Sequence, residues 1–207
     1  MCGKFLSRRE ADLAFRIRPF DEIDVVSRKL LHVRYGVYLR RGQAHPDAGR
    51  DQPGDDLANG TWAMAQYDTV SFTNEGYYGI RRLPYTVDFA RNGFTYRHIS
   101  DGEAAPMAQP IEPSGAPNSE VHNAGEVWAT MMWEAYIALH KAHAEVGDLD
   151  FAGVRRRLGD IVVAGMILAP ESPTFLEQRD ALLMAAAAID PADFTTIAAA
   201  FARRGAG

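Results

Sequence analysis

Cysteine is almost absent from this sequence, and so is any long uninterrupted apolar segment. The single cysteine, Cys2, excludes an internal disulfide framework and a cysteine-rich zinc site. No apolar run reaches the roughly 20 residues that a membrane-spanning helix needs, so the sequence predicts no membrane partner. The first ten residues also contain no apolar stretch of the kind that a signal peptide requires.

Charge is distributed unevenly along the 207 residues. Of the 22 basic and 27 acidic residues, 11 and 6 lie in residues 1–50, which leaves 11 and 21 for residues 51–207. A basic arm is one mark of a nucleic-acid-binding protein, but here acidic and aliphatic residues interrupt the basic ones. We therefore predict no nucleic-acid partner. A change of sequence origin near residue 50 explains the asymmetry at least as well.

Regular apolar spacing is strongest in the C-terminal half. Apolar residues recur at i, i+3, i+4, i+7, i+8 and i+11 in the series Trp128, Met131, Met132, Ala135, Tyr136 and Leu139. This spacing marks one face of an amphipathic helix, predicted over about residues 124–145 with Asn123 and Glu126 as a capping box. The same helical phase places Glu134 and Lys141 in solvent.

Start and stop signals predict three more helices after this one. The second covers about residues 150–168 and is stopped by a proline. The third covers 173–189, with Ser172 as its cap, and the fourth covers 191–204, after an Asp-Pro start signal. Four helices joined by short loops form a compact helical lobe.

The remaining residues show no sustained period. Residues 59–120 are rich in aromatics, glycine and proline, which is typical of ordered loops. Residues 1–58 form an unassigned basic segment and connector, irregular or α+β in character. The sequence therefore predicts a mainly α fold with a small N-terminal segment of a different kind.

Four segments of residues 59–207 carry a family resemblance. They are GIRRLPYTVD at 79–88, VHNAGEVWATMMWEAY at 121–136, GMIL with PTFLEQRDA within 165–181, and AFARRG at 200–205. In this order and spacing they resemble the fungalysin family of secreted zinc endopeptidases, which have a two-lobed thermolysin-like fold. The resemblance implies a helical C-terminal lobe, protein or peptide substrates, cleavage of internal peptide bonds and an extracellular location.

The zinc-binding motif of that family is missing from this sequence. Its members hold zinc with two histidines of an HExxH helix and a glutamate of the next helix, which leaves one metal position open for a water. None of the six histidines here belongs to an HExxH pattern, and the glutamate motif expected upstream of Asn59 is absent. Zinc is thus the cofactor of the intact family, and we expect none in this chain.

Two interpretations follow from that absence. The chain is a truncated C-terminal lobe of the peptidase, inactive alone, as a truncated or frameshifted gene would produce. Alternatively, it is a non-catalytic helical interaction module descended from the peptidase. In either case the cleft face would lack its other wall, and uncovered apolar surface favours self-association.

The resemblance also implies three site residues. His122 matches the family histidine that donates a hydrogen bond to the oxyanion of the attacked carbonyl. Glu120 either orients His122 or is a solvated loop carboxylate. Arg82, slightly preferred over Arg81, matches an arginine that bonds the substrate carbonyl, with a salt bridge as the alternative for either one.

Two further features are weaker. His140 and His143 share a helix face and could bind metal, but a solvated helix C-terminus explains them better. The first five residues, MCGKF, resemble the start of the SRAP family, in which the cysteine crosslinks to abasic DNA. The other active-site segments of that family are not recognisable here.

Overall fold

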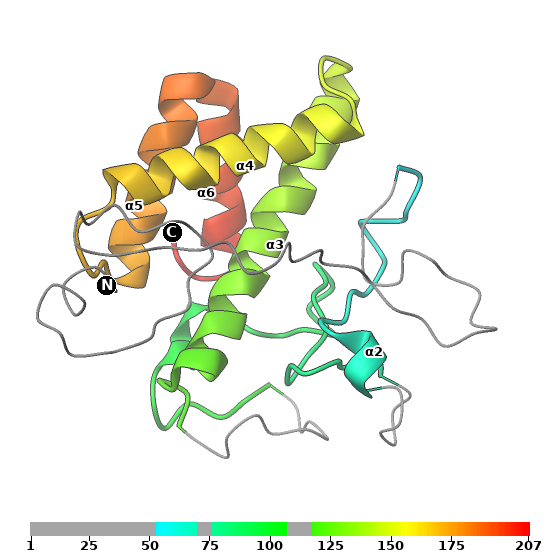
Figure 1. The fold of residues 1–207 in the computed structure, drawn as a ribbon, viewed down its shortest axis with the longest axis vertical. Coiled ribbons are helices and arrows are strands. Elements are labelled where there is room, and N and C mark those ends of the chain that lie inside the picture. Colours follow the sequence, from blue (N-terminus) through cyan, green and yellow to red (C-terminus); the bar gives the residue numbers. More distant parts are fainter. Residues whose placement is uncertain (1–52, 70–75, 107–116) are drawn as a thin grey trace, which may run out of the picture. The chain divides into compact units, whose positions relative to one another are not determined.

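The computed structural model describes residues 53–69, 76–106 and 117–207, all within one compact unit, Leu39–Gly207. The expectations for residues 1–52, including the basic segment and Cys2, lie outside the described residues. The expected mainly α fold is confirmed, and no strand occurs among the residues described (Figure 1). The elements are α2 Gln66–Thr69, η1 Tyr96–Ile99, α3 Val121–Val146, α4 Phe151–Leu168, α5 Phe175–Ile189 and α6 Pro191–Arg203.

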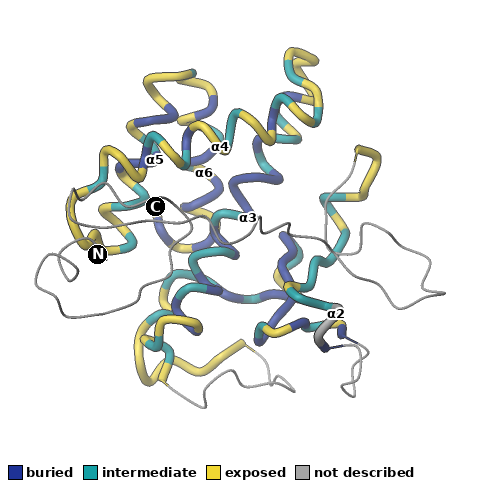
Figure 2. The backbone as a smooth tube through the Cα atoms, viewed as in Figure 1, coloured by how far each residue is buried: buried dark blue, intermediate teal, exposed yellow. Residues whose placement is uncertain are grey.

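Helix α3 is central to the core. It starts earlier than predicted, because the N-cap is Glu120 rather than Asn123, and it ends where Gly147 takes the left-handed conformation at φ 76°. The predicted apolar stripe faces the core: Met131, Ala135, Tyr136 and Leu139 are buried, while Trp128 and Met132 are half-buried. Figure 2 shows this buried run along α3. None of the described helices could cross a membrane.

The predicted exposure of Glu134 is wrong, whereas Lys141 is exposed as predicted. Glu134 is only 5% exposed, and its Oε2 accepts a hydrogen bond of 2.8 Å from Arg204 Nε. Arg203 Nη1 bonds to the other carboxylate oxygen. Helix α6 thus covers the side of α3 that the apolar stripe had assigned to solvent.

The prediction of solvated histidines at the end of α3 is also wrong for His143. This residue is 5% exposed, and its two ring nitrogens lie 2.7 Å from Asp148 Oδ1 and 2.9 Å from Asp193 Oδ1. Arg157 Nη1 donates to the other oxygen of Asp193 at 2.6 Å. These contacts join the end of α3 to α4 and α6, so His143 connects helices rather than binding metal.

Short polar caps start the last three helices. Asp150 accepts a hydrogen bond from Gly153 N and caps α4, and Asp190 caps α6 ahead of a proline at the first helical position. The cap of α5 is Thr174, in a capping box with Glu177, and not the predicted Ser172. Ser172 instead takes a positive φ of 57° in the preceding loop.

Helices α4 and α5 approach each other closely at Gly165. A methyl group added there would lie 2.7 Å from Leu182 Cδ2 and 3.0 Å from Leu182 Cα, so the missing side chain permits the contact. Gly159, on the same helix, has nothing within 4 Å of that position. Gly165 is therefore required by the contact between the two helices, whereas Gly159 only lowers the stability of the helix.

We expect Gly165→Ala to destabilise the chain by about 1–3 kcal/mol, because overpacking moves two helices apart. Gly159→Ala should stabilise it by about 0.5–1 kcal/mol, the helix propensity difference between the two residues. Urea denaturation followed by circular dichroism measures both. Equal effects of the two variants would show that α4 and α5 do not meet at Gly165.

Candidate functional site

The start of α3 has an acidic cap. Glu120 Oε2 accepts hydrogen bonds from His122 N at 2.9 Å and Asn123 N at 3.2 Å, which satisfies two of the unpaired N–H groups of the first turn. The hydrogen bond from the His122 side chain holds the pKa of Glu120 below its usual value. The stabilisation that this ionised cap gives is fully present above the ordinary carboxyl pKa. It is lost as pH falls through the lowered pKa of Glu120.

His122 is paired with the same carboxylate. Its Nδ1 lies 2.7 Å from Glu120 Oε1, and its side chain is 60% exposed. An ionised carboxylate only accepts hydrogen bonds, so Nδ1 carries the hydrogen in this contact. The opposite nitrogen, Nε2, has no hydrogen-bond partner among the described residues. Glu120 therefore contacts the His122 ring, and its role in orienting that ring stays a prediction.

Arg82 lies behind the same helix start, in the protein interior. Its Nε donates to Glu126 Oε1 at 2.5 Å, and its backbone N–H donates to Glu126 Oε2 at 2.9 Å. Both side chains are almost fully buried. Burial raises the pKa of Glu126, although the charge and hydrogen bonds of Arg82 oppose that rise. The pair fixes the loop around residue 82 to the second turn of α3.

The remaining donors of Arg82 also have protein partners. Nη1 donates to Asn118 Oδ1 at 3.2 Å and Nη2 to the Asn123 carbonyl at 3.1 Å, and the guanidinium lies 4.7 Å from the Phe94 ring centroid. These contacts match the salt-bridge alternative, buried rather than at the surface. The substrate-binding role of Arg82 stays a prediction.

Arg81 is less enclosed than Arg82. It is half-buried, its Nη2 lies 3.5 Å from Met64 Sδ, and its Nε has no partner among the described residues. The structure thus brings His122, Glu120 and Arg82 to one helix terminus. Sequence reasoning did not identify the three groups that accept hydrogen bonds from the Arg82 side chain, which are Glu126, Asn118 and the Asn123 carbonyl. The predicted capping box of Asn123 and Glu126 is wrong, because Glu120 is the cap and the Glu126 carboxylate bonds Arg82.

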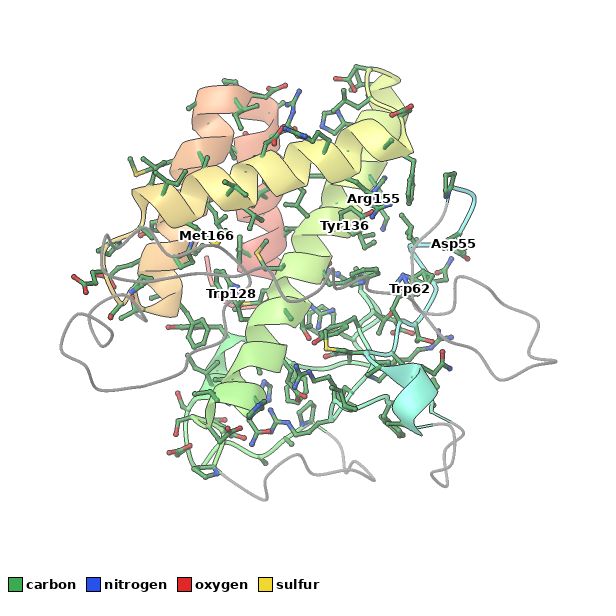
Figure 3. The ribbon with its side chains drawn as sticks, viewed as in Figure 1. Asp55, Trp62, Trp128, Tyr136, Arg155 and Met166 are labelled. Atoms are coloured by element: carbon green, nitrogen blue, oxygen red, sulfur yellow. The ribbon has the colours of Figure 1, made fainter. Side chains whose placement is uncertain are left out.

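An apolar pocket of about 440 Å³ lies on another side of α3. It is lined by Tyr96, Ile99, Trp128, Pro173, Thr174, Phe175 and Gln178. The Trp128 ring, labelled in Figure 3, packs 5.6 Å from the Phe175 ring and 5.7 Å from the Phe201 ring. His122 is not among the lining residues, so the expected cleft face stays a prediction.

The described residues do not fit a zinc site. Within them, no three histidine, cysteine, aspartate or glutamate side chains gather where they could share a metal ion. His122 and Glu120 supply two candidate donors, which are bonded to each other, whereas a catalytic zinc needs three protein ligands. No chemical step is therefore assigned to a metal held by these residues.

Comparison with known proteins decides the family. Residues 47–207 match the family model of the fungalysin metallopeptidases. This chain belongs to the fungalysin family. The match to the family model begins at residue 47, which is earlier than residue 59, where the resemblance seen in the sequence begins. Fungalysins are zinc metallopeptidases, and the described helices agree with a C-terminal helical lobe of such a protein.

The curated relatives are extracellular metalloproteinases by name. Extracellular metalloproteinase 3 of Arthroderma otae is 33% identical over 137 residues, which is 62% of this chain and 19% of that protein. Extracellular metalloproteinase mep of Aspergillus terreus is 26% identical over 160 residues, 73% of this chain and 23% of that protein. The chain thus spans about a fifth of the length of these relatives.

Proposed function

We propose that residues 59–207 form the part of a fungalysin catalytic domain that stabilises the oxyanion during cleavage of internal peptide bonds. The observation that carries this proposal is the Glu120–His122 pair at the start of α3. In the imidazolium form of His122, Glu120 accepts the hydrogen bond of Nδ1–H, and the second N–H, at Nε2 on the opposite side of the ring, is the donor for the oxyanion. Protein or peptide substrates and an extracellular location follow from the relatives' names.

The chemistry of peptide hydrolysis explains why this pair is useful. Attack of a water that has given up a proton to a base places negative charge on the peptide carbonyl oxygen. A preoriented N–H donor stabilises that charge more than it stabilises the neutral substrate, so it lowers the barrier. Glu120 fixes the orientation of the ring by accepting the hydrogen bond of Nδ1–H, and the Arg82–Glu126 pair fixes the helix start that carries the ring.

We further propose that these residues do not hydrolyse peptides alone. The water that attacks the carbonyl needs activation, which a bound zinc supplies in this family. The described residues offer no ligand set for it. The isolated lobe would therefore contribute the oxyanion donor and part of the substrate surface, while the zinc ligands come from another polypeptide segment.

A chimera tests this proposal. Residues 59–207 of this chain would replace the matching segment of extracellular metalloproteinase 3 of Arthroderma otae. We expect about one zinc per chimera by elemental analysis and hydrolysis of casein, whereas the 207-residue chain alone shows neither. One tightly held zinc per molecule of the chain alone would contradict the proposal. A folded, zinc-loaded chimera without activity would contradict the assigned role of the lobe.

A further inference from the structure

Asn59, Gly60 and Thr61 form a tripeptide that the functional site does not use. It matches the acceptor pattern for N-linked glycosylation, which is an asparagine with serine or threonine two residues later and no proline between them. Of the five asparagines in the chain, only Asn59 has a hydroxyl residue at that position. A three-residue pattern also arises by chance, so the place of Asn59 in the fold decides its meaning.

The structure places Asn59 in an exposed turn. Its backbone N–H donates to Asp56 Oδ1 at 3.1 Å, and its side-chain Nδ2 lies 3.1 Å from Asp56 Oδ1 and 3.0 Å from Asp56 Oδ2. Asp56 is exposed as well, so the Asn59 amide lies at the protein surface. The turn lies between Asp55 and Trp62, which Figure 3 labels.

The backbone around Asn59 is held by hydrogen bonds on both sides. Arg91 Nη1 donates to the Asn59 carbonyl at 2.8 Å, and Gly60 N–H donates to the carbonyl four residues earlier at 2.7 Å. Just after the tripeptide, Trp62 exchanges two backbone hydrogen bonds, of 2.9 and 2.8 Å, with Tyr85. The fold therefore presents the Asn59 side chain at a fixed point of the surface.

The turn itself explains Gly60 but not Thr61. A methyl group added at Gly60 would lie 2.7 Å from the Asp56 carbonyl oxygen and 2.8 Å from the Trp62 ring, so the turn requires glycine there. The Thr61 hydroxyl, in contrast, has no hydrogen-bond partner among the residues that the structure describes. The fold thus gives no reason for a hydroxyl at residue 61, whereas glycosyl transfer to Asn59 requires one.

We propose that Asn59 is an N-glycosylation site whose donor is a lipid pyrophosphate that carries an oligosaccharide beginning with N-acetylglucosamine. In the transfer, a bond forms between Asn59 Nδ2 and C1 of this sugar. The bond from C1 to the pyrophosphate oxygen breaks, and the pyrophosphate leaves with the lipid. One of the two Nδ2 hydrogens is lost as a proton.

A glycan at Asn59 is compatible with the folded turn. The glycosylated amide keeps one of its two hydrogens, and Asp56 offers two carboxylate oxygens to it. The hydrogen bond from Asn59 N to the same carboxylate does not involve the modified atom. The turn therefore keeps its side-chain contact while the sugar extends into solvent.

This inference rests on the extracellular location within the proposed function, because N-linked glycans are added to proteins that enter the secretory pathway. It does not depend on peptidase chemistry. An inactive chimera that is secreted from yeast with a glycan at Asn59 would contradict only the role assigned to the lobe. An active chimera that is secreted without one would contradict only the glycosylation site.

Production of the full 207-residue chain in yeast, behind a cleavable secretion signal, tests the site. We expect a product that migrates more slowly in gel electrophoresis than the bare polypeptide and returns to its position after digestion with peptide-N-glycosidase. That enzyme converts the modified asparagine into aspartate, so peptide mapping after digestion in heavy-oxygen water should place the label at Asn59. A parallel sample without the glycosidase accounts for spontaneous deamidation.

Two substitutions of Thr61 provide matched variants. Thr61→Ser keeps the hydroxyl and should keep the glycan, whereas Thr61→Val keeps the shape of the side chain without the hydroxyl and should lose the glycan. Cell-associated protein is measured with secreted protein, because the transfer precedes folding and a misfolded variant still reports it. A parent chain with an unmodified Asn59 overturns the proposal, and so does a glycan that Thr61→Val retains in full.

Discussion

Replacement of His122 by alanine in the zinc-loaded chimera is expected to lower kcat by about a hundredfold or more, the usual cost of losing one oxyanion donor. Zinc content should not change, because His122 bonds only to Glu120 within the described residues. KM should change little, since the lost interaction forms in the transition state. Initial rates of hydrolysis of a casein-derived peptide give kcat and KM, and elemental analysis of the same samples gives the zinc content.

Two variants make this experiment specific. Val121→Ala changes the neighbouring exposed side chain and should leave kcat within about twofold, which excludes a general effect of disturbing the helix start. Glu120→Gln keeps the shape of the cap but removes its charge, so we expect an intermediate loss of kcat. A His122→Ala chimera as active as its parent would show that the oxyanion donor is another residue.

The parts of the fold that the sequence predicts well depend on local signals. Asp150 and the Asp190–Pro191 pair start their helices as expected, because a cap bonds to an N–H two or three residues away. The Glu120–His122 contact is equally local, with two residues of separation. The site roles of these two residues, in contrast, came from the family resemblance and stay predictions.

Apart from the caps assigned to Asn123 and Ser172, the predictions that failed concern polar residues whose partners are distant in sequence. Glu134 bonds Arg204 across 70 residues, His143 bonds Asp193 across 50, and Glu126 bonds Arg82 across 44. Helical periodicity assigns a charged residue to the solvent side, and only the position of another element can reverse that assignment. The partners that hold Arg82 in the interior were therefore beyond sequence reasoning.

The Glu134–Arg204 pair shows how strongly such contacts hold the lobe together. Arg204 is fully buried, and besides Glu134 it donates to three backbone carbonyls, those of Thr86, Asn92 and Phe94, at 2.7–3.0 Å. One side chain near the C-terminus thus joins α3 to the loop around residues 86–94. Its charge is balanced by Glu134, with Arg203 bonded to the same carboxylate.

Glu134→Gln is therefore expected to lower the free energy of unfolding by about 3–5 kcal/mol, because it leaves the buried Arg204 charge without a counter-ion. For a chain of this size that corresponds to a fall in Tm on the order of 10 °C. Thermal denaturation followed by circular dichroism measures it. Lys141→Gln, an exposed change on the same helix, should stay within about 0.5 kcal/mol of the parent.

A second variant separates charge from shape at this site. Replacing both partners, as in Glu134→Gln with Arg204→Met, removes the unpaired charge and should be less destabilising than the sum of the two single variants, since residues in direct contact couple. Strict additivity of the two changes would mean that the carboxylate and guanidinium do not interact. A Glu134→Gln variant as stable as the parent would place Glu134 in solvent, where helical periodicity alone had put it.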